Sequence, residues 1–102
     1  MAHDEAYYQA EKKIEEALKS GATELNLGDM GLNELPESLW QLTQLEKLYL
    51  YNNYPLVATL PELLTKLENL QLLDLAYNNV GVLPEWICSL TQLRKLILFS
   101  SG

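Results

Sequence analysis

Hydrophobic residues recur along the chain in one sequence motif that appears four times. Its copies are 23, 25 and 23 residues apart, and they begin at Ala22, Leu45, Leu70 and Leu93. A period of this length is typical of solenoids, in which a unit buries its apolar face only by stacking on a neighbour. The spacing therefore predicts a tandem array with repeats at residues 22–44, 45–69 and 70–92 and a partial repeat at 93–102.

Two hydrophobic periods share each unit. In the third unit Leu73 and Leu75 are two residues apart, as in a strand, whereas Leu83, Ile87 and Leu90 have spacings that suit a helical turn or two opened by a proline. Each unit is thus predicted to contain a strand, a turn and a short helical return. The predicted strands are parallel and lie near Thr23–Leu27, Lys47–Tyr51, Leu72–Ala76 and Lys95–Phe99.

The segment before the repeats predicts a helix over Asp4–Lys19, with acids in its first turn and Gly21 shortly after its end. One side of this helix carries an apolar stripe opposite charged residues. We expect the stripe to cover the open end of the first repeat, so that residues 1–21 form an N-terminal cap. The stripe consists of Tyr7, Ala10, Ile14, Ala17 and Leu18.

Residues Ala22 to Phe99 resemble the leucine-rich repeat family in its 23-residue class, LxxLxLxxNxLxxLPxxLxxL. In the third unit the match runs from Leu70 through Asn78 to Leu83, Pro84 and beyond. The resemblance implies an α/β fold, a right-handed solenoid with a parallel concave sheet of about four strands and helical or irregular segments on the convex side. With the N-terminal capping helix, this is the predicted fold class.

The resemblance also gives a role to Asn53 and Asn78, which match the asparagine of the family motif. In that family the asparagine side chain satisfies buried backbone groups where the chain leaves the strand. Met30 occupies this position in the first unit and Ser101 in the fourth, so the row of asparagines is expected to lack both ends. The second unit carries two extra residues within Asn53–Leu60, for which we expect a bulged loop.

Composition and charge exclude several classes of protein. Lys and Arg total 7 against 14 Asp and Glu, a net charge of −7, and this disfavours nucleic-acid binding, which needs a basic patch. No apolar run approaches the roughly 18 to 20 residues of a membrane span, and the polar first residues exclude a secretory signal. The single cysteine allows no internal disulfide, so the cytoplasm is the predicted compartment.

Candidate chemistry is sparse, and the chain is predicted not to be an enzyme. His3 lies near the terminus, and Cys88 lies in a return segment without a histidine nearby, so neither is expected to act in catalysis. Acids such as Glu15 and Glu16 are interpreted as a solvated helix face and not as a metal site. No phosphate loop or zinc spacing is present, and we expect no cofactor and no metal.

The variable residues between the strand leucines are the candidate binding residues, because strand alternation points them to the solvent-facing, concave side. Aromatic residues are enriched at interface cores, and apolar patches mark partner sites. The alternative is that tyrosine is favoured in strands in general. The predicted protein-binding residues are Lys47, Tyr49, Tyr51, Leu72, Asp74, Ala76, Tyr77, Lys95, Ile97 and Phe99.

A weaker candidate lies on the convex side, at Trp40, Leu63 and Trp86. Each of these residues stands beside a leucine or isoleucine that is predicted to be buried. Tryptophans at such positions could bind a partner or simply fill the space between successive returns. We favour packing.

The strand predicted over Leu93–Phe99 is followed by only three residues, so no capping element is expected to cover its free edge. Two functions remain open. The chain could be a protein-protein interaction module that presents its concave sheet. Alternatively, it could be a self-assembling structural unit, an engineered or truncated repeat protein, that forms a homodimer through this edge or the concave face.

Overall fold

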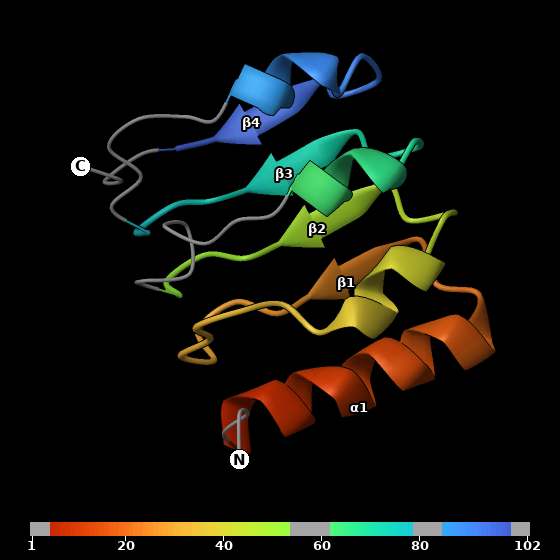
Figure 1. Cartoon of the computed structure of the whole chain (residues 1–102), viewed down its shortest axis with the longest axis vertical. Helices are drawn as coiled ribbons and strands as arrows, with labels where there is room; N and C mark the ends of the chain where they lie inside the picture. The colour runs from red at the N-terminus through yellow and green to blue at the C-terminus, as the bar shows by residue number, and fades with distance from the viewer. Residues whose placement is uncertain (1–4, 54–61, 79–84, 99–102) are drawn as a thin grey trace.

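The computed structural model describes residues 5–53, 62–78 and 85–98, apart from the side chains of residues 62 and 63. Figure 1 shows helix α1 packed at one end of a row of strand-and-return units. The strands form one parallel sheet in the order β1-β2-β3-β4, as predicted. Their bounds are β1 Glu24–Asn26, β2 Lys47–Tyr49, β3 Leu72–Asp74 and β4 Lys95–Ile97.

Helix α1 runs over Glu5–Ser20, against a prediction of Asp4–Lys19, and Asp4 lies outside the described residues. The helix ends because Gly21 adopts a positive φ of 69°. The backbone N–H of Ala22 then donates to the carbonyl of Ala17 at 3.0 Å, which is the bond that closes a Schellman motif. The predicted glycine stop is therefore confirmed.

The apolar stripe of α1 covers the first repeat, as the pattern predicts. Tyr7, Ala10, Ile14 and Ala17 are buried, and the helix contacts both β1 and the return that follows it. The prediction is wrong for Leu18, which is 44% exposed. This residue stands at the margin of the stripe, about 40° of helix rotation beyond Ile14, so the contact with the repeat ends before it.

The same helix also reaches the free edge of the sheet. Lys13 Nζ donates to the backbone carbonyl of Asn26, at the end of β1, at 3.2 Å. A sheet edge presents unpaired backbone groups, and covering them with a helix prevents edge pairing. The segment therefore acts as a cap in the structure.

Each strand contains three residues, against five in the prediction. Backbone pairing continues beyond these bounds, because Leu27 donates to Tyr49 O and Asp29 to Tyr51 O, both at 2.8 Å. The regular geometry ends early because the chain turns into the left-handed region soon after each of the first three strands, with φ of 60° at Asp29, 53° at Asn52 and 59° at Tyr77. The chain thus leaves the sheet by a sharp left-handed turn.

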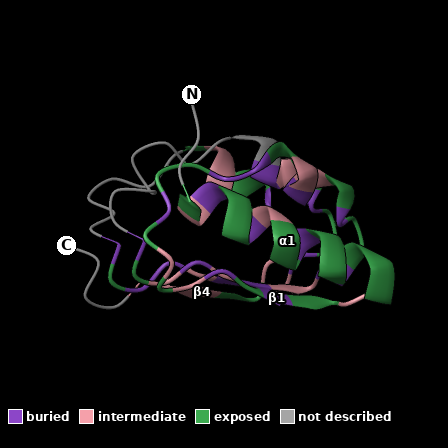
Figure 2. Cartoon of the chain, turned by 90° about the horizontal axis from the view of Figure 1, so that it is seen from below, coloured by how far each residue is buried: buried purple, intermediate pink, exposed green. Residues whose placement is uncertain are grey.

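The returns are 3₁₀ helices of five residues each, at η1 Glu37–Gln41, η3 Glu62–Lys66 and η4 Glu85–Ser89. Pro36 stands at the N-cap of η1 in an extended conformation, which agrees with the predicted proline opening. Leucines from the strands and returns meet in one layer between them, and Figure 2 shows this layer as buried segments facing each other across the molecule. Trp40 and Trp86 pack against this core, in agreement with the packing interpretation.

The asparagine prediction is confirmed for the two positions in the described residues. Asn53 and Asn78 are 0% and 1% exposed. Asn78 Oδ1 accepts from the backbone N–H of Asn53 at 2.7 Å, and its Nδ2 donates to Leu50 O at 2.8 Å. Each asparagine thus joins its own unit to the preceding one. Ser101 and most of the inserted loop Asn53–Leu60 lie outside the described residues.

Tyr7 gives the cap a predictable response to alkaline pH. Burial raises the pKa of the Tyr7 phenol above 10.0, a hydrogen bond with the Glu37 backbone lowers it in part, and the carboxylates of Glu11, Glu34 and Glu37 raise it further. A group whose pKa is raised by folding stabilises the fold below its unfolded pKa, and this contribution disappears as pH rises through the folded pKa. The unperturbed phenol pKa is about 10. We therefore expect the free energy of unfolding, measured with urea between about pH 9 and pH 11, to fall more steeply with pH for the parent than for Tyr7→Phe. Parallel pH profiles would contradict this expectation.

Candidate protein-binding face

The open face is the side of the sheet that faces away from the leucine core, and it presents two rows of side chains across the strands. The pairing register places Glu24, Lys47, Leu72 and Lys95 in the first row and Asn26, Tyr49, Asp74 and Ile97 in the second. Gly28, Tyr51 and Ala76 follow two residues after the second row. The register therefore brings the predicted binding residues of three different repeats onto one surface.

Most predicted residues are accessible on this face. Lys95 and Tyr77 are exposed, whereas Ala76 is only 2% exposed and contributes little surface. Phe99 lies outside the described residues. The other predicted residues are half-buried, and they are Lys47, Tyr49, Tyr51, Leu72, Asp74 and Ile97.

The Tyr51 ring lies against the neighbouring repeat, over Gly28. A Cβ atom added at Gly28 would lie 2.5 Å from Cε2 and 2.6 Å from Cε1 of the Tyr51 ring. Asn26 Nδ2 donates to the Tyr51 hydroxyl at 3.1 Å, and Asn26 Oδ1 accepts from the Gly28 N–H at 2.8 Å. The ring therefore lies over Gly28, with its hydroxyl fixed by Asn26. We call this arrangement of Gly28, Asn26 and Tyr51 the Tyr51 clamp. The sequence analysis did not predict it. The one available sign was a glycine in the first unit at the position that Tyr51 and Ala76 occupy in the next two units.

The clamp makes Gly28→Ala a test of the Tyr51 position. The new methyl group must displace the ring and break the Asn26 hydrogen bond, so we expect a loss of about 1 kcal/mol in the free energy of unfolding. In a Tyr51→Ala background the same change should cost almost nothing. Urea unfolding of the four proteins in a double-mutant cycle measures this coupling. An equal cost in both backgrounds would show that Gly28 serves another purpose.

Tyr77 follows the open face at the end of β3 and has an unfavourable backbone conformation. Its φ of 59° lies in the region where asparagine and glycine are preferred, and the equivalent residues are Asp29 and Asn52. Tyr77 is also 51% exposed, so its ring contributes little to the core. We expect Tyr77→Asn to raise the free energy of unfolding by about 0.5 to 1 kcal/mol. A lower melting temperature than that of the parent would contradict this expectation.

Charged residues on the open face occupy different rows: Glu24, Lys47 and Lys95 lie in the first row and Asp74 in the second. Lys47 Nζ lies 3.9 Å from Glu24 Oε2, so one of the two strand lysines has an acidic neighbour in its own row. Asp74 stands in the next row, where its Oδ1 accepts from the Ala76 N–H at 3.0 Å. The amino ends of the strands therefore hold the lysines of this face, and the carboxyl ends hold Asp74 and the tyrosines.

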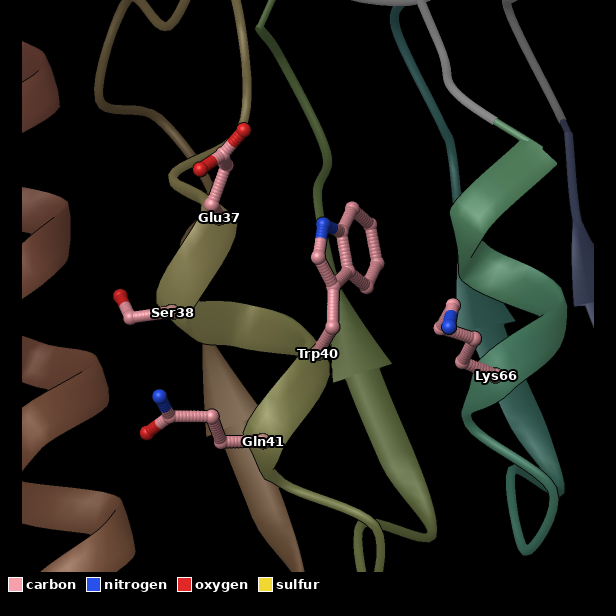
Figure 3. A pocket seen from close by; sticks show the side chains of 5 residues that line it. All are labelled: Glu37, Ser38, Trp40, Gln41 and Lys66. Carbon is pink, nitrogen blue, oxygen red and sulfur yellow. The ribbon is translucent and has the colours of Figure 1, made fainter.

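The convex side has a hollow of about 540 Å³ lined by Glu37, Ser38, Trp40, Gln41 and Lys66. In Figure 3 the Trp40 ring lies between η1 and η3, whereas Ser38 and Gln41 extend from the other side of η1 towards α1. Ser38 Oγ is buried without a hydrogen-bond partner in the described residues. A nucleophilic serine needs an adjacent base, and these side chains do not converge on one point, so the hollow does not assemble catalytic groups.

Cys88 is an exposed free thiol on η4. Among the described residues, no cluster of three or more His, Cys, Asp or Glu side chains is arranged to hold a metal ion. None of the helices in the described ranges has the length and apolar character needed to cross a membrane. The open face, with its half-buried aromatic and aliphatic side chains, is therefore the surface to consider for binding.

These observations define a repeat protein built from stacked strand-and-3₁₀ units. The family model described as leucine rich repeat matches residues 43–101, and the chain belongs to the leucine-rich repeat family. The structure of a leucine-rich repeat protein of Leptospira interrogans is similar, with a TM-score of 0.72 and 37% sequence identity over 82% of this chain. The match covers 21% of that protein, so this chain spans about a fifth of its length. The comparison with curated proteins found no match.

Proposed function

We propose that the chain is a non-catalytic protein-interaction module that binds its partner with the open face. The observation that carries this proposal is the concentration of half-buried apolar and aromatic side chains, Tyr49, Tyr51, Leu72 and Ile97, on the one side of the sheet that no other described element covers. Interface cores are enriched in such residues, and rigid aromatic side chains lose little conformational entropy on binding. The family supports protein binding in general.

Selection from a displayed library of random peptides tests the location of the binding surface. Peptides selected on the parent should lose at least about fivefold in affinity for Tyr49→Ser and Leu72→Asp, because the central residues of an interface commonly cost more than about 1 kcal/mol when they are replaced. Glu16→Gln on the outer side of α1 is the matched surface control and should leave affinity unchanged. Peptides that tolerate both open-face substitutions would contradict the proposal.

A second candidate function is self-association through β4, and a burial difference favours it. Leu93, Leu96 and Leu98 are partly exposed, whereas Leu45, Leu48 and Leu50 at the equivalent positions are 0% exposed. β4 pairs with β3 along one edge, and no other described strand pairs with it. Identical edges related by a two-fold axis would run antiparallel.

Light scattering after size exclusion separates the two functions. A homodimer at tens of micromolar that becomes a folded monomer on the double change Ile97→Lys and Phe99→Lys supports self-association through β4, by its backbone edge or by its open-face side chains. A parent that is already monomeric removes the assembly function and leaves the binding module. A cytoplasmic location remains a prediction from the single cysteine.

A further inference from the structure

A polar hollow of about 280 Å³ lies between the third and fourth repeats, where two turns lead into β3 and β4. These turns lie beside each other at the amino ends of the strands (Figure 1). We infer that the polar hollow binds a carboxylate group of a peptide, from an acidic side chain or from a C-terminus, and this inference does not depend on the open face. The lining residues are Asn69, Gln71, Thr91, Gln92, Leu93 and Arg94.

The polar hollow lies where the chain lacks a hydrogen bond that joins the preceding repeats. Asn69 Nδ2 donates to Thr43 O at 2.9 Å and so bridges the second and third units. Gln92 stands at the equivalent position of the fourth unit, but among the described residues it donates no such bond to Glu68 O. Its Oε1 instead accepts from the Thr91 hydroxyl at 3.4 Å, within its own unit. The junction between the third and fourth units is therefore left open at this point, with the Gln92 amide beside it.

Arg94 gives the polar hollow its charge. Gln71 and Arg94 are neighbours across the two strands, because the Arg94 N–H donates to Gln71 O at 2.8 Å. Arg94 is exposed and Gln71 is half-buried, and neither side chain makes a hydrogen bond or an ion pair with another described residue. The hydrogen-bonding capacity of both side chains is thus available to a ligand.

The chemistry of this lining favours a carboxylate. A guanidinium group has five N–H donors in a planar fork that matches the two oxygens of a carboxylate, and each glutamine amide adds two N–H donors. Arg94 is the one ionised side chain in the lining, and no carboxylate lines the polar hollow, so a cationic ligand would meet repulsion without a compensating partner. The chain has a net charge of −7, so general attraction does not draw anions to it, and binding must come from these contacts.

The test compares three glutamine and glutamate derivatives by NMR titration of the full chain. N-acetylglutamate α-amide carries a side-chain carboxylate, N-acetylglutamine carries a C-terminal carboxylate, and N-acetylglutamine amide is neutral with nearly the same shape. We expect a carboxylate compound to shift the amide signals of Gln71, Gln92 and Arg94 and to bind about three- to fivefold more tightly than the neutral compound, as for an exposed ion pair. The tighter of the two carboxylate compounds identifies the source as a side chain or a C-terminus.

Three outcomes would overturn the inference. These are equal affinities for all three compounds, the absence of a saturable shift at the lining residues, and tighter binding of inorganic phosphate than of either carboxylate compound.

Two variants and a control locate the site. Arg94→Gln should reduce the affinity for the carboxylate compound to that for the neutral one. Gln92→Asn introduces the shorter amide that Asn69 has, which we expect to reach Glu68 O and close the polar hollow, so weaker binding is again expected. Both variants change exposed side chains, and unchanged signals of the buried leucines check that the fold persists.

Lys95→Gln is the matched control, because Lys95 is the next cation along β4 but does not line the polar hollow. This change should leave the affinity unchanged. Equal losses for Arg94→Gln and Lys95→Gln would indicate general attraction by the cations of the last strand and would overturn the inference.

Discussion

Leu73→Ala is expected to lower the free energy of unfolding by about 2 to 5 kcal/mol, the largest effect that we predict for a single substitution. Leu73 is 0% exposed and lies in β3, between Leu48 of β2 and Leu96 of β4 in the sheet register. The loss combines the transfer free energy of the removed carbon atoms with the cost of a cavity that a close-packed core fills only in part.

Its neighbour Leu72 is the matched control, because it has the same chemistry in the same strand but faces the open side and is half-buried. We expect Leu72→Ala to cost less than about 1 kcal/mol. Urea unfolding followed by circular dichroism measures both changes. Domains of this size have total stabilities of only about 5 to 15 kcal/mol, so Leu73→Ala should lower the urea concentration at the midpoint of unfolding markedly. Similar midpoints for the two variants would show that the core does not dominate stability.

The leucine period predicted the fold well because each apolar position is determined by burial between neighbouring repeats. Leu25, Leu48 and Leu73 are all almost completely buried, as the two-residue spacing requires. The exact ends of the strands could not be predicted, since they depend on backbone angles at Asp29 and Asn52 and not on hydrophobicity. Leu18 was misassigned because helical spacing shows which side a residue faces but not where the contact ends.

The open face could be predicted only in outline. Strand alternation identified Tyr49 and Tyr51 as solvent-facing, but it gave no information on how a side chain lies against its neighbours. The position of Tyr51 depends on the missing side chain of Gly28 and on a hydrogen bond from Asn26, which is 25 residues away. Such a contact follows from the repeat register, and this register was known only once the strands were paired.

Asn53→Ala is expected to destabilise the chain by about 3 kcal/mol, at the upper end of the cost of stranding buried polar groups. Asn53 Oδ1 accepts from the N–H groups of Met30 and Leu32, at 3.3 and 2.9 Å. Its Nδ2 donates to the carbonyls of Leu27 and Leu50, at 2.8 and 3.1 Å. Alanine leaves these backbone groups without their hydrogen-bond partner in a site that is 0% exposed. The hydrogen bonds that join the first repeat to the second through Asn53 are then lost.

Asn69→Ala is the control, because Asn69 Nδ2 also bridges two repeats, donating to Thr43 O at 2.9 Å, but at an exposed site where water can replace it. Its removal should cost less than about 1 kcal/mol. Equal unfolding midpoints for Asn53→Ala and the parent would show that the asparagine does not have its family role here.

Asn53→Asp separates the donor role of the amide from its acceptor role. A carboxylate can still accept from Leu32, but it cannot donate to Leu27 O, and burial of its charge is unfavourable. Burial raises the pKa of the introduced carboxyl above its unfolded value of about 3.9, so the protonated form is favoured in the fold. The penalty relative to the parent should therefore be smallest below about pH 4 and increase towards pH 7. A penalty that is independent of pH across this range would show that the N–H groups of Met30 and Leu32, or water, offset the cost of burying the carboxylate.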